Sequence, residues 1–326
     1  MRYLLLTCLT LIMAGQQARA TSFTYTTIVV PGSSFTPEAA GINNSGEIVG
    51  DFSSPSALGY QGFLDNHGVF TTVSVAGSSG TQAFGVNNSG EIVGLSFTST
   101  GDTNAFLDAH GTSTVLNVFG GPGAQANGIN DSGEIVGYDS GPSFSYITGF
   151  SLKNGTVSPI FVPNSSGTEP LGINNAGQIV GTYFDRSGEP HSFLYSNGSF
   201  SPINVPGDPF ATATGINNSG EITGFMSGAL GFQGFVDDNG SFSTLFVPGS
   251  AGTEALGIND WGQVVGLYFD ANGGQHAFLA TPTPEPASFT LIGISGLALL
   301  LVRLRRVSAC TLAERGPHCS DPGPEI

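Results

Sequence analysis

The chain has 326 residues, of which 49 are Gly and only 10% are charged, and its formal net charge is −16. Such an acidic chain lacks the clustered Lys and Arg that nucleic-acid binding needs, and scarce charge with abundant Gly excludes long charged helices. The apolar share of 39% can build a core, so general disorder is excluded and an all-β, turn-rich fold is expected.

Residues 1–20 are predicted to be a secretory signal peptide, handled by the Sec export machinery. Met1 and Arg2 begin a short basic region, an apolar run follows, and small residues stand at Ala18 and Ala20. This order predicts cleavage after Ala20. A membrane anchor is the alternative, but the run is short and ends in a cleavage-like site.

Region 21–280 consists of six repeats. A ten-residue block recurs with starts 42 to 44 residues apart, a regularity that indicates a repeat architecture. The six blocks are GINNSGEIVG at 41–50, GVNNSGEIVG at 85–94, GINDSGEIVG at 128–137, GINNAGQIVG at 172–181, GINNSGEITG at 215–224 and GINDWGQVVG at 257–266.

Each repeat is predicted to contain four short strands. In the block, apolar residues flank a polar turn rich in Asn and Gly, which is typical of a β-hairpin. A third strand carries a large core Phe, and a fourth strand ends near Val-Pro-Gly because Pro donates no ladder bond. The six core Phe are Phe63, Phe106, Phe150, Phe193, Phe235 and Phe278.

Four strands in about 43 residues is the size of a propeller blade. The region begins with a fourth-strand piece at 23–30 and ends with a third-strand piece at 276–280. We therefore predict a six-bladed β-propeller whose N-terminal strand completes the last blade. A β-solenoid or β-prism-like stack is the alternative.

The repeats resemble those of the HAF-repeat bacterial extracellular proteins. His276-Ala277-Phe278 carries the His-Ala-Phe triplet, and the G-I-N-x-x-G-x-I-V-G core recurs over about 240 residues. Only the sixth repeat has the full triplet, and the fourth reads His191-Ser192-Phe193. The resemblance implies export and implies no enzymatic activity.

The C-terminal segments are predicted to form a sorting signal. Residues 281–286 are a Pro-rich spacer, 287–302 are apolar without charge, and an Arg cluster ends the segment 287–306. This order resembles the PEP-CTERM sorting signal, through the motif residues Pro284, Glu285, Pro286, Arg303, Arg305 and Arg306.

The resemblance implies transient membrane anchoring through 287–302. It also implies exosortase as a partner and delivery to the cell surface or extracellular matrix. An ordinary membrane anchor is the alternative. Residues 307–326 extend beyond the usual end of such signals and are predicted to be a disordered tail outside the function.

Composition differs between the ends and the middle. All three Cys lie outside 21–280, so disulfides and thiolate chemistry contribute nothing there. Within 21–280, Lys153 and Arg186 are the only Lys or Arg against 20 Asp and Glu, which gives a formal charge of −18.

No catalytic motif is found, and no catalytic residue is assigned. His67 and His110 fall in turns and are expected to be exposed. His191 and His276 occupy equivalent positions in two repeats, which indicates a role in packing or hydrogen bonding.

The polar turns are weak candidates for Ca²⁺, with Asn130, Asp131 and Glu134 as the best set. The spacing does not match an EF-hand, and two repeats carry Gln in place of Glu, so hairpin turns stabilised by Asx hydrogen bonds are favoured. No metal site or other cofactor is assigned.

Trp261 is the only Trp and replaces a small turn residue, so it is a weak candidate for ligand binding through sugar stacking. The favoured function is a non-enzymatic, exported binding or structural module associated with exopolysaccharide or biofilm. The alternative is a polysaccharide hydrolase or lyase that uses carboxylates at a propeller mouth.

Overall fold

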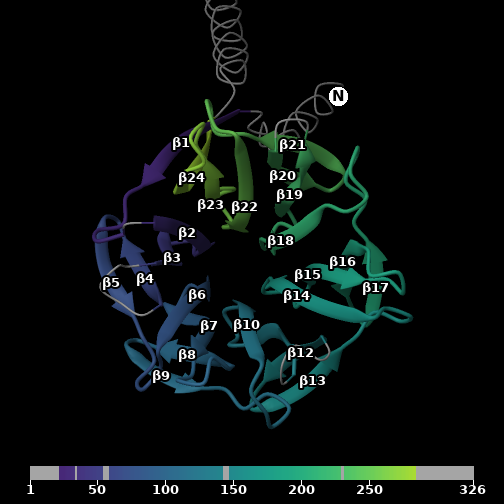
Figure 1. Cartoon of the computed structure of the whole chain (residues 1–326). Helices are drawn as coiled ribbons and strands as arrows, with labels where there is room; N and C mark the ends of the chain where they lie inside the picture. Colours follow the sequence, from purple (N-terminus) through teal and green to yellow (C-terminus); the bar gives the residue numbers. More distant parts are fainter. Residues whose placement is uncertain (1–21, 34, 54–58, 142–146, 229–230, 284–326) are drawn as a thin grey trace, which may run out of the picture. The chain divides into compact units, whose positions relative to one another are not determined.

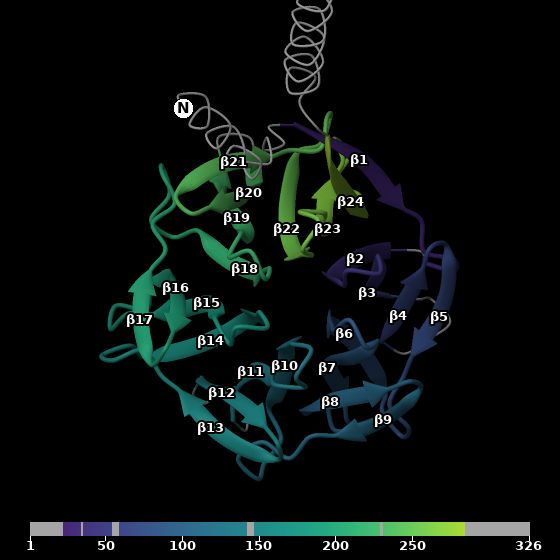
Figure 2. The same cartoon turned by 180° about the vertical axis from the view of Figure 1, so that it is seen from behind.

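The computed structural model describes residues 22–33, 35–53, 59–141, 147–228 and 231–283. Every regular element in these ranges is a β-strand, and the strands form six four-stranded antiparallel sheets. Residues 23–282 form one compact unit. In that unit the sheets stand as blades around a central axis (Figures 1 and 2).

Each blade is numbered from its innermost strand outward. Blade 1 is β2 (Phe35–Ile42), β3 (Glu47–Ser53), β4 (Tyr60–Asn66) and β5 (Val69–Val73); blade 2 is β6 (Gly80–Val86), β7 (Glu91–Phe97), β8 (Thr103–Ala109) and β9 (Thr112–Val115); blade 3 is β10 (Ala124–Ile129), β11 (Ile135–Asp139), β12 (Thr148–Lys153) and β13 (Thr156–Ile160). Blade 4 is β14 (Gly167–Ile173), β15 (Ile179–Phe184), β16 (Pro190–Ser196) and β17 (Ser199–Pro202); blade 5 is β18 (Thr212–Ile216), β19 (Ile222–Gly228), β20 (Gly231–Asp238) and β21 (Ser241–Leu245); blade 6 is β22 (Gly252–Ile258), β23 (Val264–Phe269), β24 (Gln275–Thr283) and β1 (Ser22–Ile28).

Blade 6 closes the ring. Its strand order is β1-β24-β23-β22, so the N-terminal strand supplies the outermost strand beside the C-terminal strand. The prediction of a six-bladed propeller with this closure is confirmed, and the solenoid and prism alternatives are wrong. Closing the sheet series into a ring removes the open ends that a linear stack of repeats would need to cap.

The repeated block explains the start of every blade. Its apolar residues end the first strand and begin the second, and the Asn-Gly turn joins them. In blade 3, Gly133 has a φ of +73°, which a residue with a side chain rarely adopts. A Cβ on Gly137 would lie 2.0 Å from the carbonyl oxygen of Gln125, so this position admits only glycine.

The core lies between the blades. The predicted core Phe of each third strand is at most 2% exposed in all six blades, which confirms its role. β-branched residues of the second strand are fully buried against these rings: Val136 packs in a cluster with Phe193 of the next blade, and Val180 with Phe235. The blades are therefore held together by packing of their faces as well as by the axial contacts described below.

Strand β24 continues to Thr283, so the last blade includes the first three residues of the expected spacer. The predicted signal peptide at 1–20, the motif and apolar segment at 284–306 and the tail at 307–326 lie outside the described residues. Among the described residues, no helix is long and apolar enough to cross a membrane.

Candidate functional site: the two ends of the central channel

The first Asn of each block forms an Asx turn. In blade 3, Asn130 Oδ1 accepts hydrogen bonds from the backbone N–H of Ser132 at 3.1 Å and of Glu134 at 3.0 Å. The same pair of bonds recurs in the other five turns. The favoured reading of these turns as hairpins stabilised by Asx bonds is confirmed.

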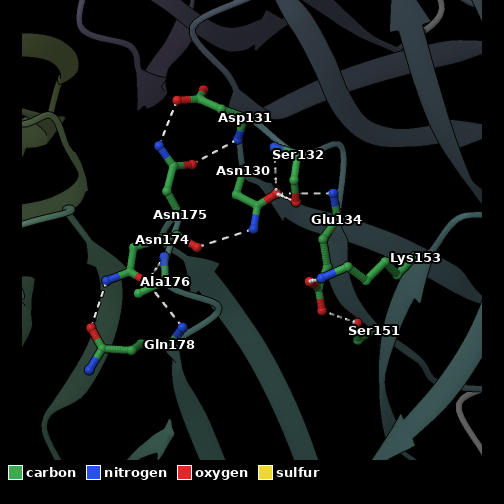
Figure 3. Close-up of polar contacts among 10 residues, drawn as sticks. All are labelled: Asn130, Asp131, Ser132, Glu134, Ser151, Lys153, Asn174, Asn175, Ala176 and Gln178. Carbon is green, nitrogen blue, oxygen red and sulfur yellow. Dashed lines mark hydrogen bonds and ion pairs between the residues drawn. The ribbon is translucent and has the colours of Figure 1, made fainter. Parts of the chain in front are cut away.

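These Asn side chains also join the blades. Asn130 Nδ2 donates to the carbonyl oxygen of Asn174 in the next blade at 3.2 Å, and Figure 3 shows this bond. The equivalent bonds run from Asn43 to Asn87, Asn87 to Asn130, Asn174 to Asn217, Asn217 to Asn259 and Asn259 to Asn43. The six bonds form a closed cycle around the axis.

A second cycle lies beside the first. It uses the next residue of each turn, and we call these six residues the asparagine ring: Asn44, Asn88, Asp131, Asn175, Asn218 and Asp260. Each backbone N–H donates to Oδ1 of the next member at 2.8 to 2.9 Å. A repeat that folds alone could not make these bonds, because every donor and its acceptor belong to different blades.

The two Asp of the ring accept the remaining amide donors. Asp131 Oδ2 accepts from Nδ2 of Asn88 at 2.8 Å and of Asn175 at 2.6 Å. Asp260 Oδ2 accepts in the same way from Asn218 and Asn44. The two Asp stand at every third position of the ring, and each accepts from two Asn, so all four Asn side-chain amides have an acceptor.

The pKa of the Asp131 carboxyl is lowered. Partial burial opposes the change, but the hydrogen bonds from Asn88 and Asn175 favour the charged form and outweigh it. This carboxylate is therefore an ionised acceptor at neutral pH.

Figure 3 shows where the weak Ca²⁺ candidates lie. The Asp131 carboxylate is turned toward Asn175, whereas the Glu134 carboxylate accepts from Lys153 Nζ and Ser151 Oγ, both at 2.7 Å. The Asn130 side chain is already bonded at both ends: its Oδ1 accepts from the turn backbone, and its Nδ2 donates to the next blade. The three side chains do not converge, and no group of three or more His, Cys, Asp or Glu in the described ranges is arranged to hold a metal ion.

The channel below the asparagine ring is narrow. Two cavities of about 70 and 90 Å³ lie on the axis, and both are lined by a collar of apolar residues. The collar consists of Ile42, Val86, Ile129, Ile173, Ile216 and Ile258. A β-bulge precedes it in each inner strand, and the bulged residues, such as Asn127 and Leu171, line the second cavity.

Polar residues return four positions before the collar. We call them the glutamate ring: Glu38, Gln82, Gln125, Glu169, Thr212 and Glu254, all half-buried. Since they lie on the same inner strands, they stand toward the opposite end of the channel from the asparagine ring. The repeat pattern does not single these residues out because the residue type varies, although a polar residue stands at this position in all six repeats.

The carboxyls of this ring have raised pKa values. Burial raises the pKa of Glu38 to about 7, and the charge of Glu254 in the adjoining blade adds to the effect. Burial also raises the pKa of Glu169 to about 7 and raises that of Glu254. A proton is therefore bound more tightly here than by an exposed carboxylate.

Two further polar groups lie beside the ring on the second strands. Asp51 is paired with Glu38 and accepts from Gln82 Nε2 at 3.1 Å, and burial followed by the charge of Glu38 raises the pKa of Asp51 well above its usual value. Thr182 is paired with Glu169, and its hydroxyl is the one buried side-chain polar atom of the described residues that has no hydrogen-bond partner.

The His side chains have structural partners. His276 Nε2 lies 2.9 Å from Asp270 Oδ2 and stacks on Tyr268, and His191 makes the same pair with Asp185 at 3.3 Å. The prediction of a packing and hydrogen-bonding role for these two His is confirmed. His67 and His110 are exposed, as expected.

Trp261 stands at the edge of the asparagine ring. Its side chain is 70% exposed, and its Nε1 donates to the carbonyl oxygen of Asn44 at 3.0 Å. The indole thus bridges blade 6 and blade 1.

No family model matches the chain, and no curated protein matches it either. Among solved structures, TolB from Acinetobacter baumannii is 16% identical over 74% of this chain and 65% of that chain, with a TM-score of 0.51. AofleA from Arthrobotrys oligospora is 10% identical over 81% of this chain and 90% of that chain, with a TM-score of 0.52. The match spans slightly less than two thirds of TolB, and identities this low show the propeller fold alone.

Proposed function

We propose that this protein is an exported, non-enzymatic binding module that associates with polysaccharide at the cell surface or in the extracellular matrix. The predicted signal peptide at 1–20 and the PEP-CTERM-like segment at 284–306 support export and sorting. The propeller between them supplies a rigid surface that presents loops on both faces.

The observation that decides where the proposed ligand would bind is the narrowness of the axial channel. The two axial cavities, of about 70 and 90 Å³, are far smaller than the several hundred Å³ of ordinary ligand pockets. A sugar ring does not fit inside them, so a glycan must be bound on the outer surface. Extended polymers suit such a surface, because many weak contacts along the chain add up to stable attachment.

The net charge of the repeat region limits which class of polysaccharide it can bind. Region 21–280 has a formal charge of −18 with two basic residues, so an anionic polysaccharide is repelled at low salt. The expected partner is a neutral polysaccharide.

Co-sedimentation tests the binding role. The exported protein, recovered from the producing cells, is mixed with insoluble exopolysaccharide from the same cells, and the protein in the pellet is measured. We expect saturable binding without release of reducing ends. A chain that stays in the supernatant at all polymer concentrations would disprove the proposed function.

Fractionation tests the sorting role. Replacing Pro284-Glu285-Pro286 with three Ala is expected to leave the protein in the membrane fraction, whereas the parent chain reaches the cell surface or medium. Identical distributions of the two chains would contradict the sorting proposal.

A carbohydrate-active hydrolase or lyase is the second candidate, and the Glu38–Glu254 pair favours it. Two neighbouring carboxyls, of which one has a pKa of about 7, resemble the acid and base of glycoside hydrolysis. Release of reducing ends by the parent chain, and its loss in Glu38→Gln, would support this candidate. Binding without cleavage supports the first.

A further inference from the structure

We propose that Trp261 is the stacking platform of a binding site for a neutral glycan, located on the face of the propeller that carries the asparagine ring. This inference rests on the proposed function and names the contact through which it acts. It is carried by the position, exposure and hydrogen bonding of one side chain.

Trp261 departs from its repeat position. The equivalent turn residues in the other blades are small and exposed: Ser45, Ser89, Ser132, Ala176 and Ser219. The indole is therefore the only large side chain at this position in the turns that surround the axis. The five equivalent turns therefore add no large side chain that would compete with the indole for a flat ligand.

The indole is also held in place. Its Nε1 donates to the Asn44 carbonyl at 3.0 Å, and the Trp261 backbone N–H donates to Asn259 Oδ1 at 3.1 Å. Asn44 is itself fixed by the asparagine ring, through bonds with Asn88 and Asp260. An aromatic ring fixed before binding loses little conformational entropy when a ligand stacks on it.

This geometry decides which part of the indole is available. The one polar atom of the side chain is already used inside the protein, so what remains exposed is apolar aromatic surface. The negative face of an aromatic ring attracts the positively polarised C–H groups of a pyranose. A sugar face therefore matches the exposed surface better than a ligand that requires a hydrogen bond from the indole.

The surroundings specify a neutral sugar. The Asp260 carboxylate precedes Trp261 in the turn and is committed to the amides of Asn218 and Asn44. It cannot neutralise an anionic group and repels one instead. The site is open rather than enclosed, so it suits one residue of a long polymer more than a small free sugar.

The same hydrogen bond allows a purely structural role, as a latch between blade 6 and blade 1. Two variants separate the roles. Trp261→Phe keeps an aromatic face and removes the Nε1 bond, whereas Trp261→Ala removes both. A glycan platform predicts that binding survives the first change better than the second, and a latch predicts equal loss of stability in both.

The experiment uses the single Trp as its own reporter. The full chain is titrated with dextran, cellohexaose and, as an anionic comparison, alginate, while tryptophan emission is recorded. We expect a saturable change of emission with at least one neutral glycan and none with alginate. Because the chain has one Trp, this signal comes from Trp261 alone.

Co-sedimentation with the producing cell's exopolysaccharide completes the test. Trp261→Ala is expected to weaken binding about tenfold or more, and Trp261→Phe by about threefold. Phe210→Ala, at a 45% exposed aromatic residue in a loop between blades 4 and 5, is the matched control and should leave binding unchanged.

The outcomes separate this inference from the proposed function. If the parent chain binds the polymer and Trp261→Ala binds it equally well, the platform is wrong and the function stands. If the parent chain binds no polymer, the proposed function fails as well. Equal losses of thermal stability with no loss of binding would make Trp261 a latch only, and an emission change with alginate alone would overturn the neutral class.

Discussion

The two rings at the ends of the channel differ in how their polar side chains are paired near the axis. In the asparagine ring, each side-chain amide and each carboxylate has a partner in a neighbouring blade, and the bonds close into cycles. In the glutamate ring, burial raises the pKa values of the carboxyls, and Glu38 and Glu254 add charge repulsion across one blade boundary. The asparagine ring therefore stabilises the closed propeller, whereas ionisation of the buried carboxyls in the glutamate ring is unfavourable.

The contrast between the two ends of the channel shows how one repeat can serve two purposes. The turn residues are nearly constant, so all six blades make the same inter-blade bond. The residue four positions before the collar changes between Glu, Gln and Thr, so each blade boundary there has its own polarity. Uniformity at one end of the channel fixes the architecture, and variation at the other leaves room for a specific chemistry.

The strongest way to break both rings is to disturb the strand pair that joins them. Gly137→Ala would place a Cβ 2.0 Å from the carbonyl of Gln125, within the hairpin that carries residues of both rings. We expect a loss of about 4 kcal/mol or more in the free energy of unfolding, measured in urea. Gly121→Ala, where a Cβ meets no atom within 4 Å, is the control and should change stability by less than about 0.5 kcal/mol.

The cycle of inter-blade bonds made by the first Asn of each turn can be opened at one residue. Asn174→Ala removes two turn bonds and the bond to the Asn217 carbonyl, and leaves buried backbone groups without partners. We expect a loss of about 2–4 kcal/mol in thermal or urea unfolding. The exposed Asn117→Ala serves as the control, and an equal effect of the two changes would show that the cycle contributes little.

The glutamate ring is tested by pH. Glu38 and Glu169 bind protons more tightly in the folded chain than in the unfolded chain, so stability is highest below their unfolded pKa and falls as pH rises toward about 7. We expect a loss of about 1–3 kcal/mol per carboxyl between pH 4.5 and 8. Glu169→Gln should flatten the curve, and an unchanged slope would contradict the assignment.

Asp131 responds in the opposite direction. Its pKa is lowered, so the stability that it contributes is present above its unfolded pKa and is lost as the pH falls below that value. The melting temperature should therefore decline on both sides of a mildly acidic optimum. A melting temperature that rises steadily to pH 8 would refute the opposing roles of the two rings.

The smallest expected effect comes from the acceptors of the asparagine ring. Asp131→Asn places an amide donor against the amides of Asn88 and Asn175. Because these groups are exposed, the expected loss is about 1 kcal/mol, measured by urea unfolding. Asp260→Asn should behave alike, because its carboxylate accepts the amides of Asn218 and Asn44 in the same arrangement.

Most of the fold could be predicted from the sequence, and the two rings could not. The Asn-Gly turns, the β-branched strands and the buried Phe are local signals, and their period gives the blade. In the asparagine ring, the bond from the Asp131 backbone N–H to Asn175 Oδ1 depends on how closely neighbouring blades approach at the axis, which no single repeat specifies. The glutamate ring was missed for another reason: Glu38, Gln82 and Thr212 share a position without sharing a residue type.

The order of residues in the asparagine ring gives the propeller a pseudo-two-fold symmetry. Blades 1 to 3 read Asn, Asn, Asp, and blades 4 to 6 read the same. Asp131 takes one amide from its own half, Asn88, and one from the other half, Asn175. Three blades are therefore the smallest unit whose acceptors match its donors, and a ring built from two identical three-blade chains would satisfy the same bonds as this single chain.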